Sequence, residues 1–121
     1  MSERSGAPCE LFDQNDTIHY IGYMNTKTVT GFISSLSLEE SPAGLSVYEK
    51  ALWFAGKGEW EKAHDLIQDV DDKQAAAIHA YLHRKEGNLS NARYWYVKAD
   101  SPVPAISLEE EWESLVAHFI L

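Results

Sequence analysis

The spacing of apolar residues most constrains the fold, because it follows a helical period in every clear segment after residue 25. In the first such segment, Val29, Phe32, Ile33 and Leu36 recur at positions i, i+3, i+4 and i+7, which places them on one face of a helix. Later segments repeat this spacing, and none reads convincingly as a strand. The sequence therefore predicts an all-α fold. We expect about six helices, near residues 26–36, 46–55, 60–67, 73–86, 89–99 and 107–121.

Capping and turn residues divide these segments. Ser46 with Glu49, and Ser107 with Glu110, are capping-box pairs that open two of the helices. Only about three residues join the second helix to the third, so these two must form an antiparallel hairpin. The fourth helix, near residues 73–86, has apolar residues on two sides, which predicts a central position.

The length of 121 residues allows a single domain. Residues 1–25 are expected to be an N-terminal extension, partly disordered, because their first 16 positions are polar and without pattern. Residues 18–24 are apolar but too short for periodicity to assign. The single all-α helical domain is then expected to span residues 26–121.

The charge balance excludes one class of partner. Ten basic and 19 acidic residues give a net charge of −9, whereas binding to a phosphate backbone depends on Lys and Arg. We therefore expect no nucleic acid. No apolar run approaches the roughly 20 residues of a membrane-spanning helix, so we expect no membrane association. A single cysteine and the lack of a secretory signal pattern predict a cytoplasmic location.

Two of the predicted hairpins share a short pattern. Placing Gly58 over Gly87 aligns GEWEKAHDLI with GNLSNARYWY, so that Ala63 falls on Ala92. This pattern resembles the second half of a tetratricopeptide repeat, although the period is 29 residues and the family's is about 34. The resemblance implies antiparallel helix hairpins in a tetratricopeptide-like right-handed stack over about residues 46–104.

A second resemblance covers about residues 41–115. The blocks, in order, are ALW, GEWEKAH, HAYLHRKEG, NARYWY and EEEWESL. They are similar to those of a family of small, uncharacterised bacterial proteins that shares ALW, GxWxxAH, HAYLHRKEG and NAxYWY. The resemblance supports the helical fold and implies no activity.

The histidines are the residues most suited to chemistry. His79 and His83 lie four apart on one helix and therefore project from the same face. Antiparallel packing of the preceding helix could bring His64 near them, and Glu86 could supply a carboxylate. Such residues are ligands for Zn²⁺ or another transition metal. The candidate pocket consists of His64, Gln68, His79, His83, Arg84, Glu86 and Trp95.

The expected role of these histidines is nevertheless structural, with no bound metal and no cofactor, because buried imidazoles generally find backbone or carboxylate partners. His64, His79 and His83 are the weak metal-ligand candidates. Arg84 is expected at a solvated helix end, or paired with an acidic residue or an anion. The sequence HAYLH at residues 79–83 has Ala80 where the H-E-x-x-H motif of metalloproteases has its catalytic Glu, which excludes that mechanism. The sequence leaves open whether the chain is an enzyme of another kind.

These observations predict a protein–protein interaction module that holds a protein or peptide partner against aromatic and charged helix faces. The alternative is a small-molecule- or metal-binding protein, or an enzyme, with a pocket around His64, His79 and His83. The chain ends in apolar Phe119, Ile120 and Leu121, which must pack within the chain or form a homodimer through the C-terminal helix.

Overall fold

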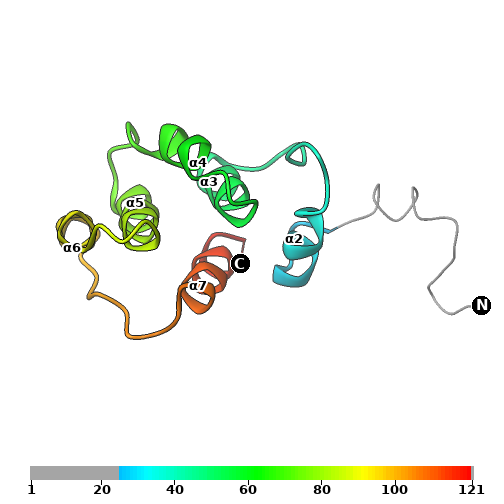
Figure 1. The fold of residues 1–121 in the computed structure, drawn as a ribbon. Helices are drawn as coiled ribbons and strands as arrows, with labels where there is room; N and C mark the ends of the chain where they lie inside the picture. The colour runs from blue at the N-terminus through cyan, green and yellow to red at the C-terminus, as the bar shows by residue number, and fades with distance from the viewer. Residues whose placement is uncertain (1–24, 121) are drawn as a thin grey trace, which may run out of the picture.

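The computed structural model describes residues 25–120, and within this range it contains six helices and no strand. The predicted all-α fold is confirmed. Residues 1–24 of the expected N-terminal extension, and Leu121, lie outside the described residues. The helices, labelled in Figure 1, are α2 (Val29–Ser35), α3 (Val47–Gly56), α4 (Trp60–Ile67), α5 (Lys73–Lys85), α6 (Leu89–Lys98) and α7 (Leu108–Ile120).

Side-chain caps begin the helices where the sequence predicts. The Ser46 hydroxyl accepts a hydrogen bond from the Glu49 backbone N–H at 3.1 Å, and the Glu49 carboxylate accepts one from the Ser46 backbone N–H at 2.8 Å. Ser107 and Glu110 form the same reciprocal pair. Each box satisfies backbone donors that a helix start leaves without partners.

Glycines with positive φ make the two hairpin turns. Gly58 between α3 and α4 has φ of 82°, and Gly87 between α5 and α6 has φ of 90°. These are left-handed conformations that a side chain would oppose. The two glycines aligned in the sequence pattern therefore have the same structural role.

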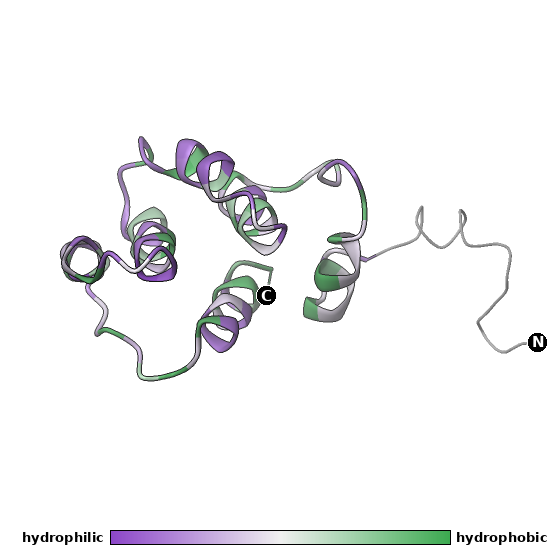
Figure 2. Ribbon diagram, in the orientation of Figure 1, coloured by the Kyte–Doolittle hydropathy of each residue, from purple (hydrophilic) through white to green (hydrophobic). Residues whose placement is uncertain are grey.

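Helix α5 is central, as its two apolar sides predict. It packs against α3, α4, α6 and α7, and Figure 1 shows it between α6 and the other helices. Helix α7 closes the fold against α2, α3 and α5. Figure 2 shows hydrophobic and hydrophilic residues within the same helices, as amphipathic packing requires. The largest fully buried side chains include those of Trp53, Phe32, Leu52, Ile67, Ile78 and Leu82.

The two aligned hairpin segments are similar only in part. Ala63 and Ala92 are both buried, so each permits a close helix approach. Trp60 packs against the main core, whereas Leu89 is 52% exposed. Leu89 is exposed because α6 packs chiefly on α5 alone. The right-handed tetratricopeptide-like stack stays a prediction.

The end of the chain packs onto its own core. Phe119 stacks on Tyr48 with ring centroids 5.0 Å apart, and Ile120 also contacts the core. A homodimer through the C-terminal helix stays a prediction. None of the helices in residues 25–120 is long and apolar enough to cross a membrane.

Candidate metal centre

Three of the predicted site residues come together between α4 and α5. His64 is half-buried on α4, while His79 and His83 on α5 are only 5% and 6% exposed. One ring nitrogen from each of the three lies within 4.8 Å of the others. We call His64, His79 and His83 the histidine cluster. The predicted spacing on α5 and the packing of α4 against α5 together produce this convergence.

The closest contact in the histidine cluster joins the two helices. His64 Nε2 and His79 Nε2 are 3.0 Å apart, with the two rings nearly perpendicular at 83°. His79 and His83 stack one helical turn apart, with centroids 4.8 Å from each other. The Nε2 atoms of His64 and His79 therefore meet at hydrogen-bond distance between α4 and α5.

Two tryptophans enclose the histidine cluster. Trp60 stacks on His64 at a centroid distance of 4.8 Å, and Trp95 on α6 stacks on His79 at 3.8 Å. The Trp60 indole N–H donates to the Leu82 carbonyl at 2.7 Å, which fixes the ring. These contacts restrict the imidazole orientations and replace water on one side of each ring.

Glu86 orients the third histidine. The Nδ1 atom of His83 lies 2.7 Å from Glu86 Oε2, so a proton on Nδ1 is held by the carboxylate. The other ring nitrogen, Nε2, then carries a lone pair. A carboxylate behind a histidine in this way is the usual arrangement behind metal-ligating imidazoles.

The environment favours neutral imidazoles. Burial, followed by the neighbouring His64 and His83, lowers the pKa of His79 from 6.5 to about 4. Burial and His83 also lower the pKa of His64, although Asp65 and Glu86 oppose the shift. A neutral imidazole is the form that binds metal.

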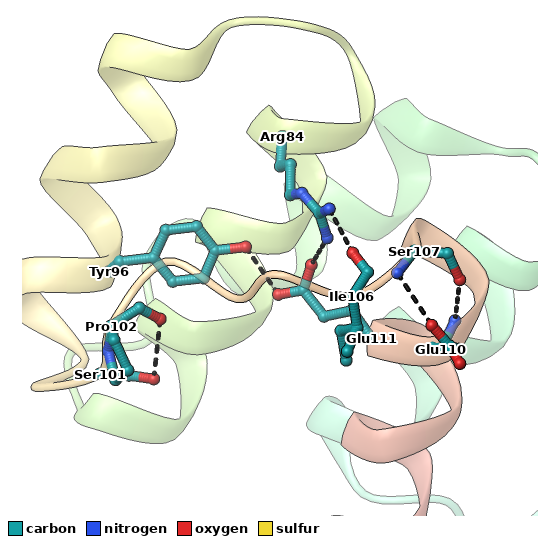
Figure 3. A network of polar contacts seen from close by, with 8 residues as sticks. All are labelled: Arg84, Tyr96, Ser101, Pro102, Ile106, Ser107, Glu110 and Glu111. Carbon is teal, nitrogen blue, oxygen red and sulfur yellow. Dashed lines mark hydrogen bonds and ion pairs between the residues drawn. The ribbon is translucent and has the colours of Figure 1, made fainter.

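The remaining predicted site residues lie elsewhere. Gln68 is exposed at the end of α4, and none of the side-chain hydrogen bonds in residues 25–120 joins it to the histidine cluster. Arg84 donates from Nη1 to Glu111 Oε1 at 2.7 Å and from Nη2 to the Ile106 carbonyl at 2.5 Å, as Figure 3 shows. The expectation of a solvated helix end is wrong for Arg84, whose side chain is only 19% exposed, and the alternative of pairing with an acidic residue is confirmed. This pairing joins α5 to α7.

Sequence reasoning missed the partners of Arg84. Tyr96 donates from its hydroxyl to Glu111 Oε2 at 2.6 Å, completing the network drawn in Figure 3. We call Arg84, Tyr96 and Glu111 the arginine network. Glu111 lies three residues after Leu108 and four before Leu115. An acidic residue in an apolar stripe was therefore a signal that could have identified it.

Comparison with known proteins adds no relative. No family model, curated protein or solved structure gives a significant match to the chain. The two resemblances seen in the sequence stay predictions, and functional inference depends on the geometry of the chain itself.

Proposed function

We propose that this protein binds a divalent transition-metal ion, with Zn²⁺ as the first candidate, through His64, His79 and His83. The observation that carries the proposal is the convergence of three imidazole nitrogens from two helices within 4.8 Å. Imidazole is a favoured ligand of Zn²⁺, Cu²⁺ and Ni²⁺. Three such ligands leave one tetrahedral position of Zn²⁺ for water or another small ligand.

The distances support a shared ion. Two nitrogens on one tetrahedral Zn²⁺ lie about 3.3 Å apart, because each Zn–N bond is about 2.0 Å long. The 3.0 Å separation of His64 Nε2 and His79 Nε2 is close to this value. The three nitrogens lie within 4.8 Å of one another, so the widest separation must shorten by about 1.5 Å for all three to bind one ion.

The hydrogen bonding also favours a metal over a purely structural role. A structural histidine is satisfied by a carbonyl or a carboxylate, and Glu86 does this for His83. Among the side-chain hydrogen bonds of residues 25–120, those of His64 and His79 reach only each other. A cation would accept both lone pairs without requiring one imidazole to donate to the other.

Titration calorimetry of the full chain with Zn²⁺ tests the proposal, with Co²⁺ as a spectroscopic probe of coordination. We expect one ion per chain and a visible Co²⁺ spectrum of a low-coordinate site. The double variant His79→Ala, His83→Ala should lose this binding and keep its helical circular dichroism. His118→Ala is the matched control, because His118 is exposed on α7 away from the cluster.

Equal Zn²⁺ binding by the native chain and the double variant would overturn the proposal, as would the absence of stoichiometric binding. If the double variant does not fold, its loss of Zn²⁺ binding says nothing about the site, and the single variant His64→Ala then provides the test. His64 is half-buried, so its truncation disturbs the core least, and the proposal fails if this variant binds Zn²⁺ as the native chain does.

A further inference from the structure

Helix α6 has three exposed large apolar side chains, more than any other helix in residues 25–120. Val97 is 78% exposed, Tyr94 56% and Leu89 52%. Most large apolar side chains on a small protein are at least partly covered, and a group of exposed ones on one face marks an interaction surface. This surface lies outside the histidine cluster, so an inference from it goes beyond metal binding.

These residues share one face of the helix. Successive residues of a helix are rotated by about 100° around its axis. Viewed along this axis, Leu89 and Lys98 mark the two edges of a half-circle, and Val97 lies between them. All exposed residues of α6 lie on this arc, whereas Ala92 and Tyr96 on the other side are buried against α5. We call the arc the α6 outer face. It consists of Leu89, Ser90, Arg93, Tyr94, Val97 and Lys98.

The charge of the α6 outer face is opposite to that of the chain. Arg93 and Lys98 are its only ionised residues, and it holds no acid, although the whole chain has a net charge of −9. Lys98 Nζ lies 5.6 Å from the Tyr94 ring centroid and 5.4 Å from that of Trp95. The aromatic rings therefore hold a cation beside exposed apolar side chains.

We propose that the α6 outer face docks an acidic amphipathic helix of a partner protein. The apolar stripe of such a helix would cover Leu89, Tyr94 and Val97, and its acids would meet Arg93 and Lys98. Charge complementarity selects this occupant. The same face of a second copy would place Arg93 and Lys98 against like charges, and a phosphate backbone offers no apolar stripe to cover Leu89, Tyr94 and Val97. Neither occupant satisfies both the cations and the apolar side chains of this face.

The test is selection from a displayed library of helical peptides against the full native chain, followed by affinity measurement with the enriched peptides. We expect enriched sequences to be amphipathic and net acidic. Their binding should weaken in high salt. Amide chemical shifts should change chiefly at residues 89–98 when the peptide is added.

A matched pair of variants locates the contact. Arg93→Glu with Lys98→Glu should lower peptide affinity at least about tenfold, because two attractive contacts become repulsive. Lys27→Glu with Lys62→Glu makes the same change in net charge at exposed positions outside α6 and should leave affinity within about threefold. Val97→Asp should weaken binding by removing apolar contact.

Four results would overturn the proposal. The selection could return no binding peptide, or peptides that are not acidic. The two charge-reversal pairs could bind equally well, or sedimentation could show that the native chain self-associates through Val97. All of these variants should bind Zn²⁺ as the native chain does, so failure of docking is distinguishable from failure of the metal site.

Discussion

The histidine cluster and the arginine network include consecutive residues of α5, His83 and Arg84. Their polar groups nevertheless have different kinds of hydrogen-bond partner. In the arginine network, both carboxylate oxygens of Glu111 accept hydrogen bonds, and the cation of Arg84 balances its charge. In the histidine cluster, two imidazole nitrogens face each other at 3.0 Å. In the arginine network the acid and the base balance each other, whereas the histidine cluster gathers three ring nitrogens within 4.8 Å of one another.

This difference separates a structural role from a ligand-binding role. A buried ion pair with its hydrogen bonds complete costs a great deal to break, because each remaining partner is left in a poorly solvated place. Imidazoles in their neutral form bind a cation, and this binding adds to the stability of the folded chain. Substitutions in the two regions should therefore differ in what they damage.

The largest effect is expected from Glu111→Ala. This change leaves the Arg84 guanidinium and the Tyr96 hydroxyl without their partner, and we expect the free energy of unfolding to fall by about 3 kcal/mol. Urea denaturation followed by circular dichroism measures it. Glu113→Ala, an exposed change on the same helix, should stay within about 0.5 kcal/mol. Similar losses in both variants would contradict a structural role for the network.

A slightly smaller effect should follow metal addition. A saturating Zn²⁺ concentration, about 100 times the dissociation constant, should raise the free energy of unfolding by about 2.7 kcal/mol, because the ion binds the folded chain. The same denaturation experiment with and without Zn²⁺ measures the change. The variant His79→Ala, His83→Ala should gain nothing, and equal stabilisation of both chains would place the metal elsewhere.

Glu86→Gln should change metal affinity more than stability. The amide cannot hold a proton on His83 Nδ1 as a carboxylate does, so we expect about a tenfold loss in Zn²⁺ affinity, with the site still present. Calorimetric titration provides the measurement. Glu61→Gln is the control, because Glu61 is an exposed acid on α4. A change confined to unfolding, with affinity unaltered, would show that Glu86 supports only the helix end.

The smallest expected effect is a loss of folding stability in alkaline solution, caused by two buried tyrosines in or near the arginine network. Burial, followed by Glu111 and Glu109, raises the pKa of Tyr81 to about 12, with Arg84 opposing the shift. Burial and the hydrogen bond to Glu111 also raise that of Tyr96. A raised pKa contributes stability that is complete below pH 10 and is lost as the pH rises toward 12.

Unfolding measurements between pH 9 and 12, paired with tyrosinate absorbance, test this expectation. Tyr81→Phe keeps the buried ring and should make stability fall less steeply in this range. An equally steep fall in that variant would assign the alkaline loss to other groups. His64 and His79 contribute no such loss, because their lowered pKa values leave both imidazoles neutral throughout this range.

Sequence reasoning predicted the elements of the site better than their partners. The i, i+4 spacing of His79 and His83 placed both on one face, and antiparallel packing of the preceding helix was expected to bring His64 near them. Pairing with an acid was only the alternative to a solvated helix end for Arg84, and its partner Glu111, 27 residues further along the chain, was not identified. The exposure of Leu89 was not predicted, because helical spacing does not reveal that α6 has chiefly one neighbouring helix.

The sequence by itself determined the helices and their turns, because capping pairs, glycines with positive φ and apolar periodicity act over a few residues. It also determined which side chains share a helix face. Only the tertiary structure decided that His64 meets His79, that Glu111 binds Arg84 and that the α6 outer face stays exposed. These contacts depend on the position of one helix against another, which the packing of the whole core sets.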